Sequence, residues 1–125
     1  MAGGKWQITN TPSANTAASA NVTAGTTGGV AIRLCALQVS LAGTAAGAAN
    51  AVVRDGATGA GTIIWSGELA CPANGSSIIA LAGLDLRATS GTLTIETTGA
   101  GGANTNLAVH AQGDIVPVGY PGFTP

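Results

Sequence analysis

Large apolar residues in this chain alternate with small or polar ones at a spacing of two, the pattern of a half-buried β-strand. Over residues 30–34 the large apolar side chains fall on even positions, and over residues 37–41 they fall on odd positions. A regular strand keeps its buried side chains on one parity. The change of parity therefore predicts a bulge near Cys35 and Ala36.

Seven further segments show related alternation or lie between turn residues, which brings the expected number of strands to about eight. About eight short strands at roughly ten-residue spacing, with no long segment of helical period, predict an all-β fold: a single antiparallel β-sandwich or jelly roll. Asp55 before Gly56, and the run from Pro72 to Gly75, are typical turn sequences. Besides 30–41, the expected strands lie near residues 6–8 and 16–22 and over 50–54, 62–69, 77–86, 92–97 and 106–116.

The same pattern assigns individual side chains to faces. Ile63 and Trp65 share a parity and are expected on one face of their strand, whereas Thr94 and Glu96 are expected to point to solvent. Residues 42–51 contain two glycines and no large apolar side chain, so we interpret them as a loop rather than a helix.

Charged residues are scarce in this sequence. Only 7% of the 125 residues are Asp, Glu, Lys or Arg, and the mean hydropathy is +0.40. Exposed domain surfaces usually carry about 25–35% charged residues. We therefore predict a homo-oligomer, a dimer or trimer, whose exterior is largely covered by copies of itself and by other subunits.

The charge balance also excludes several partners. The net charge is −1 and no two basic residues are adjacent, which argues against binding to nucleic acid or to anionic membranes. No stretch approaches about 18 consecutive apolar residues, and no apolar run follows a basic start. We expect neither a membrane span nor a signal peptide.

The composition divides the chain into three parts. Residues 1–28 are rich in Ser, Thr, Asn, Ala and Gly, and are expected to form an N-terminal arm or edge strand. Residues 29–116 are expected to form the β-sandwich domain. Residues 117–125 contain three prolines, which cannot donate to a sheet, and are expected to form a C-terminal arm.

Large rings are distributed unevenly between these parts. Trp6, Tyr120 and Phe123 lie in the terminal segments, and Trp65 alone lies in the predicted domain. Aromatic residues are common anchors of protein interfaces. We predict that Trp6 and Ile8, together with Tyr120 and Phe123, contact neighbouring subunits, and that Trp65 anchors the core. The alternative is that both termini fold back over their own sandwich.

No residue pattern indicates catalysis or metal binding. His110 is the sole histidine, it falls on the polar parity of its strand, and no serine elbow accompanies it. Cys35 and Cys71 lack the spacing of a metal site, and we expect free thiols, although their positions leave a disulfide open. Glycine-rich runs are interpreted as flexible hairpin loops, not phosphate cradles. We predict no catalytic residue, no cofactor and no metal.

The five acidic residues lie in different segments and form no convergent pair of the kind that glycoside hydrolysis requires. They are expected to be solvated or to cap turns: Asp55, Glu68, Asp85, Glu96 and Asp114.

One stretch of the sequence resembles a known class of proteins. From Arg54 to Trp65 the chain reads R-D-G-x-x-G-x-G-T-x-x-W, and Pro72-Ala73-Asn74-Gly75-Ser76 follows. In these motifs, and in style over residues 30–116, the sequence resembles small Gly/Ala/Thr-rich structural proteins of tailed bacteriophages. Within that group it looks most like capsid decoration or cement proteins built on jelly-roll-like domains.

The resemblance implies a non-enzymatic virion structural protein that binds the major capsid protein and stabilises the capsid shell. Such a protein would lie on the capsid exterior after assembly in the host cytoplasm. A tail or fibre component shares this style and is the main alternative. A carbohydrate-binding or ice-binding β module ranks lower, because exposed aromatics on the domain and a periodic Thr-x-Thr repeat are missing.

Overall fold

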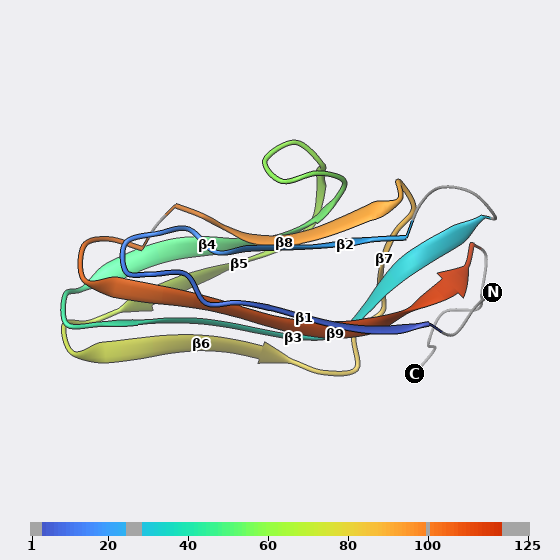
Figure 1. Ribbon diagram of the computed structural model, residues 1–125. Coiled ribbons are helices and arrows are strands. Elements are labelled where there is room, and N and C mark those ends of the chain that lie inside the picture. Colours follow the sequence, from blue (N-terminus) through green and yellow to red (C-terminus); the bar gives the residue numbers. More distant parts are fainter. Residues whose placement is uncertain (1–3, 25–28, 100, 119–125) are drawn as a thin grey trace.

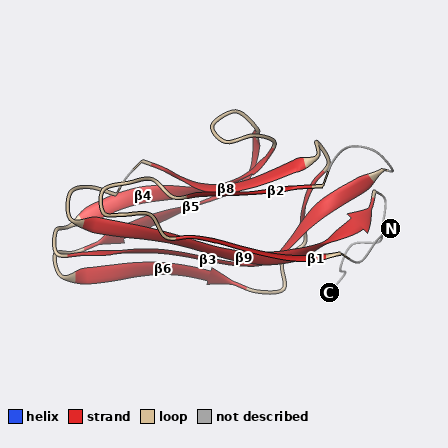
Figure 2. Cartoon of the chain, viewed as in Figure 1, coloured by secondary structure: helices blue, strands red, loops and turns tan. Residues whose placement is uncertain are grey.

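The alternating segments form strands, as their pattern predicts. The computed structural model describes residues 4–24, 29–99 and 101–118, and these residues form nine strands and no helix (Figure 1; Figure 2). The strands are β1 (Lys5–Asn10), β2 (Ser19–Thr23), β3 (Val30–Gly43), β4 (Gly47–Asp55), β5 (Thr62–Cys71), β6 (Gly75–Leu81), β7 (Leu86–Ala88), β8 (Thr92–Thr98) and β9 (Thr105–Pro117).

The strands build two antiparallel sheets that pack face to face (Figure 1). The larger sheet has the order β1-β9-β3-β6, with β7 also paired to β3, and the smaller sheet has the order β2-β8-β4-β5. The pairings are nested: β1 pairs with β9, β2 with β8, β3 with β6, and β4 with β5. This connectivity is that of a jelly roll. The predicted all-β jelly roll is confirmed, with nine strands among the described residues in place of about eight.

The core between the sheets consists mainly of aliphatic side chains, whose burial is the main favourable contribution to folding. The rings of Trp6 and Trp65 are half-buried and pack against this core from its margins. The largest fully buried apolar side chains come from five strands: Ile32, Leu34, Val39, Leu41, Val53, Leu69, Leu93, Ile95, Leu107 and Val109.

The bulge predicted from the change of parity is present in β3. Leu34 pairs with Gly113 of β9, and Ala36 pairs with Gln112, so Cys35 is the extra residue. The backbone carbonyl of Cys35 accepts a hydrogen bond from Leu84 N at 2.9 Å. The bulge thus moves the core side of β3 from even to odd positions without leaving this carbonyl unpaired.

Residues 42–51 form the end of β3, a tight turn and the start of β4, so the prediction of a loop is wrong. The glycines that suggested a loop are needed for close approach of a neighbouring chain segment. A Cβ on Gly43 would collide with the carbonyl oxygen of Asn104, and a Cβ on Gly47 would collide with that of Gly101. Small residues here let the loop before β9 pack against both strands.

Two other strand predictions need correction. Val53 pairs with Trp65 and Arg54 pairs with Ile63, so Ile64 is an extra residue in β5. This bulge moves Ile63 away from the face of Trp65 and leaves it 49% exposed. The single strand expected over residues 77–86 is broken after Leu81, and β6 and β7 pair with β3 on either side of its own bulge.

The outer face of β8 also differs from expectation. Thr94 and Glu96 are buried, although their parity predicted exposure. The loop between β4 and β5 rises over the smaller sheet (Figure 1), and it covers both side chains. Thr94 Oγ1 donates to Gly56 O at 2.8 Å, and Gly59 N donates to Glu96 Oε1 at 3.1 Å. This glycine-rich run is therefore tied to the sheet and is not the free hairpin loop that was expected.

Candidate functional site

The outward surface of the larger sheet has no charged side chain over most of its length. We call this surface, formed by the outward residues of β1, β9, β3 and β6, the large-sheet face. Its polar groups are amides, hydroxyls and one imidazole, and all but one of the residues in its two central rows are exposed. Strand register places these rows across the sheet: Gln7, Gln112 and Ala36 in one, and Thr9, His110, Gln38 and Ala80 in the next.

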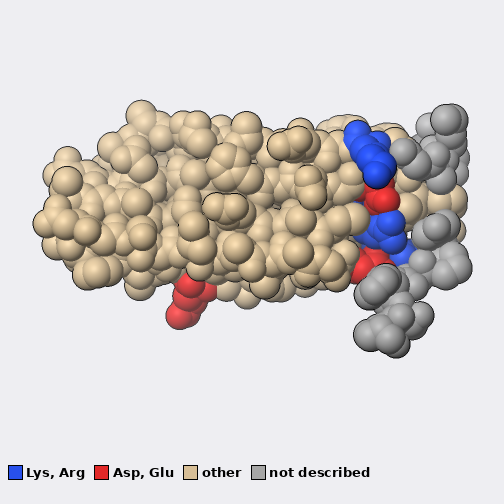
Figure 3. All heavy atoms as spheres, turned by 90° about the horizontal axis from the view of Figure 1, so that it is seen from below, with Lys and Arg blue, Asp and Glu red and all other residues tan. Residues whose placement is uncertain are grey.

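Charges gather at one end of this face. Lys5 and Arg33 lie on either side of Asp114 in register, and Arg33 Nε and Nη2 donate to the two carboxylate oxygens of Asp114 at 2.8 and 2.7 Å. Arg87 and Asp85 form a second pair at 2.8 Å. Figure 3 views the molecule from the side of the larger sheet. The blue and red spheres lie together at one end, and apart from one acidic patch at the rim the other described residues are tan.

The pairing changes the ionisation of both partners. Hydrogen bonds from Arg33 hold the pKa of Asp114 below its ordinary value, and the hydrogen bond to Asp114 raises the pKa of Arg33. Both groups are therefore charged at neutral pH and largely neutralise one another. The charged end presents little net charge.

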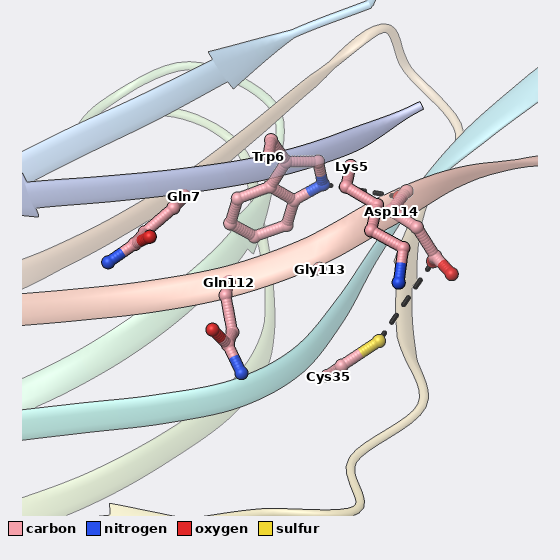
Figure 4. Close-up of a pocket in the computed structure, with 7 residues that line it drawn as sticks. All are labelled: Lys5, Trp6, Gln7, Cys35, Gln112, Gly113 and Asp114. Atoms are coloured by element: carbon pink, nitrogen blue, oxygen red, sulfur yellow. Dashed lines mark hydrogen bonds between the residues drawn. The ribbon is translucent and has the colours of Figure 1, made fainter. Parts of the chain in front are cut away.

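A pocket of about 460 Å³ lies beside this charged row (Figure 4). The indole Nε1 of Trp6 donates to the backbone carbonyl of Asp114 at 3.2 Å, and the ring lies beside Gly113. Cys35 Sγ lies 3.9 Å from Asp114 Oδ1. Burial, and then the negative charge of Asp114, raise the pKa of the Cys35 thiol. The thiol therefore stays protonated at neutral pH and is a poor nucleophile.

His110 and the two cysteines occupy the positions that the sequence suggested. His110 is exposed on the large-sheet face, and its Nδ1 lies 2.7 Å from Thr9 Oγ1. Cys35 and Cys71 are both free, as predicted. Among the described residues, no three His, Cys, Asp or Glu side chains come together where they could hold a metal ion.

The residues predicted to contact neighbouring subunits fall in two places. Trp6 and Ile8 lie on β1, an edge strand of the larger sheet, and both are half-buried against the core of their own chain. Tyr120 and Phe123 lie outside the described residues. An interface role for these four residues stays a prediction.

Trp65, predicted as the core anchor, lies on β5 at the open edge of the smaller sheet. Its ring is half-buried, and the ring and the Ile79 side chain both lie next to Gly67. A Cβ on Gly67 would lie 2.9 Å from both side chains, so the glycine makes room for the ring. The anchoring role of Trp65 also stays a prediction.

The acidic residues are more organised than the sequence suggested. Glu96 pairs with Arg54 Nε at 2.5 Å, and Arg54 Nη1 donates to Gly61 O at 2.9 Å. With Asp114 and Asp85 also paired, three of the five carboxylates in the described chain form salt bridges, so the expectation of solvated or turn-capping groups is wrong for them. Asp55, expected in a turn with Gly56, instead accepts hydrogen bonds from the backbone N–H groups of Thr89 and Ser90 and so caps the turn between β7 and β8.

Sequence reasoning missed one feature of the large-sheet face. Ile78 is 59% exposed, the largest exposed fraction among the large apolar residues that the structure describes. It points outward on β6, opposite Ser40 of β3. The signal was present in the sequence: Ile78 and Ile79 are consecutive, and in a strand one of two consecutive residues must face away from the core.

Comparison with known proteins gives a similarity in structure but none in sequence. No family model matches the chain, and no curated protein matches it in sequence. The coat protein of Tobacco streak virus is similar in structure with a TM-score of 0.36 and 14% identity, over 97% of this chain and 91% of that chain. A TM-score this low does not establish a shared fold. In the described part of the chain, no helix is long and apolar enough to cross a membrane.

Proposed function

We propose that this chain is a non-enzymatic structural subunit of a virion, a decoration or cement protein that binds the exterior of a bacteriophage capsid. The observation that carries the proposal is the large-sheet face, a broad surface of amides, hydroxyls, alanines and one exposed isoleucine with its charges confined to one end. Surfaces poor in charge and exposing apolar groups are typical of sites that a partner covers.

The jelly roll suits this role without demonstrating it, because the same fold serves capsid proteins, lectins and cupins. The protonated state of the Cys35 thiol, which makes it a poor nucleophile, favours a structural role over a catalytic one for the pocket beside it. The resemblance of residues 54–65 to phage structural proteins points to a bacteriophage as the source.

The proposed mechanism is additive. Each copy makes modest contacts with the major capsid protein and with other copies of this chain, and the symmetry of the shell repeats them many times. A ligand that binds the assembled shell and not the free subunits stabilises the shell by linkage. The edge strands β1 and β2 and the terminal segments of the chain are the elements proposed to contact the major capsid protein, which leaves the large-sheet face for contact with other copies of this chain.

The experiment is to mix the purified chain with phage shells that lack it and to separate bound from free chain by sedimentation. We expect saturable binding at a fixed number of copies per shell and a higher temperature of shell disassembly. Imaging of the particles should place the added density on the shell exterior. Absence of binding would overturn the proposal, and density confined to the tail would reassign the chain to a tail component.

A further inference from the structure

The large-sheet face combines a protruding side chain with a hollow close to it. Ile78 protrudes from β6 with 59% of its surface exposed. A shallow groove of about 340 Å³ crosses the same face, from Gln7 on β1 to Ala82 after β6. Along β3 and β6 the floor of this groove includes Ala36, Ala80 and Ala82, whose small side chains leave room for a larger apolar group.

We propose that two copies of this chain pack through their large-sheet faces about a twofold axis, each inserting Ile78 into the groove of the other. The inference deepens the proposed function, in which copies of this chain are partners, by naming the surface they share. A twofold contact is isologous, so a surface that carries both a knob and a matching hollow is complementary to itself.

The register of the sheet fixes where the axis must run. Two faces related by a twofold axis pack together only if the axis lies in the plane of the interface. With the axis across the strands, a residue of one copy then meets the residue of the other copy that lies equally far along the strand on the opposite side of the axis. Ile78 lies about 10 Å along the strand from the middle of the groove, given a rise of about 3.3 Å per residue. The axis therefore crosses the strands near the row of Gln38 and His110.

This placement gives Gln38 a hydrogen-bonding partner and separates the charges. Gln38 meets Gln38 of the second copy, and an amide can donate to and accept from another amide. Asp114 lies four residues from His110 along β9, so the two charged rows stand roughly 26 Å apart, on opposite sides of the axis. Like charges therefore do not meet. The two central rows contain no Asp, Glu, Lys or Arg, so the contact removes no such charge from water there.

The available area agrees with a dimer. Strands β1, β9, β3 and β6 contain 6, 13, 14 and 7 residues, which at a spacing of about 4.8 Å and a rise of about 3.3 Å per residue give a face of about 630 Å². A standard interface buries about 800 Å² on each partner. The face therefore reaches the lower end of the range of about 600–1,000 Å² per partner that specific dimers bury.

The first test compares two matched variants, Ile78→Lys and Ile63→Lys. Both isoleucines are about half exposed, but Ile63 lies on the smaller sheet. In sedimentation velocity at micromolar concentration, we expect the parent and Ile63→Lys to be dimers, and Ile78→Lys to be a monomer with an unchanged melting temperature. A monomeric parent, or a dimer that survives Ile78→Lys, would overturn the proposal.

The second test does not depend on how Ile78→Lys folds. In a Cys35→Ser background, Gln38→Cys places a thiol near the axis, whereas Glu68→Cys places one on exposed β5. Because facing sheets lie about 10 Å apart and a disulfide spans less than about 7 Å between Cα atoms, a thiol-reactive cross-linker about 8–10 Å long is used; it should give a covalent dimer of the first variant and not of the second. Equal cross-linking of both, or of neither, contradicts the axis. Both tests use the free chain without shells, so their failure leaves shell binding standing, and failure of shell binding leaves the dimer standing.

Discussion

At the scale of single residues, the few charged side chains of this protein act mainly in pairs that connect distant parts of the chain. Arg33 and Asp114 join β3 to β9, and Arg54 and Glu96 join β4 to β8. Such pairs could not be predicted from the sequence, because partners 81 and 42 residues apart are brought together only by strand register. The scarcity of charge was visible in the composition, and its arrangement was not.

Replacing Asp114 by Asn should lower the free energy of unfolding by about 1–2 kcal/mol near neutral pH, since two charge-assisted hydrogen bonds are weakened at a partly exposed site. The pKa of Asp114 in the folded chain is below the ordinary aspartate value of 3.8. The stabilisation is therefore present above that value and is lost as the pH falls through the folded pKa.

Thermal melts of parent and Asp114→Asn should accordingly differ at neutral pH and converge in strong acid. The exposed residue Glu68 gives the control, because Glu68→Gln removes a carboxylate of the described chain for which no ion pair is seen. This variant should melt with the parent at neutral pH. A gap between parent and Asp114→Asn that persists unchanged in acid would contradict the assignment.

Replacing Trp65 by Ala should cost about 3 kcal/mol, the lower end of the range for removing a large ring, because the ring is half-buried. For a chain of this size the melting temperature should fall by roughly 10 °C. Ile63→Ala, on the same strand but exposed, is the control and should change it little. A shift below about 2 °C for Trp65→Ala would place the ring on a binding surface instead of in the core.

At the scale of elements, a feature could be predicted from the sequence when the strand's own residues determined it, and could not when a distant segment of the chain determined it. The bulge in β3 was predictable, because it reverses the parity of the strand's own apolar residues. The burial of Thr94 was not, because it comes from a loop that reaches back across the sheet from residues 56–61. Gly43 and Gly47 read as loop signals and in fact mark close approach of another segment.

Gly113 tests the bulge directly. A Cβ at this position would collide with the carbonyl oxygen of Arg33 and with the ring of Trp6. Because one of these atoms is backbone, relief requires separating β3 from β9, and Gly113→Ala should cost more than about 3 kcal/mol or prevent folding. Gly4→Ala is the control, since its Cβ would make only ordinary contact with Ile115 at 3.7 Å. Circular dichroism and melting of both variants measure the difference, and equal stability would show that the strands tolerate the added methyl group.

At the scale of the whole molecule, the nested pairing joins residues more than 100 positions apart, as between Lys5 of β1 and Asp114 of β9. The number and spacing of strands indicated the class of fold, yet eight alternating segments are compatible with many orders in two sheets. The predicted division into a domain and two terminal arms stays a prediction, because an arm is defined by its contacts with neighbouring subunits. It can be tested by asking whether the terminal segments contact a neighbouring subunit or their own sandwich.

Deleting residues 118–125 should leave the melting temperature of the free protein nearly unchanged and reduce its occupancy on shells, if the segment docks on a neighbour. Val118 contributes one backbone hydrogen bond to Gly29 O and is 55% exposed, so its own loss costs little. Melting of the free chain and sedimentation with shells measure the two effects. A strong drop in melting temperature with binding intact would mean that the segment covers its own sandwich.

The confinement of charge to one end of the large-sheet face has a consequence for the response to salt. A dimer joined through the uncharged rows has no Coulomb attraction for ions to screen, so its dissociation constant should change less than about twofold between low and moderate sodium chloride. Sulfate, which is excluded from protein surfaces, should tighten the same dimer by favouring burial. A dimer that weakens steeply as sodium chloride is added would instead be joined through the row of Lys5, Arg33 and Asp114.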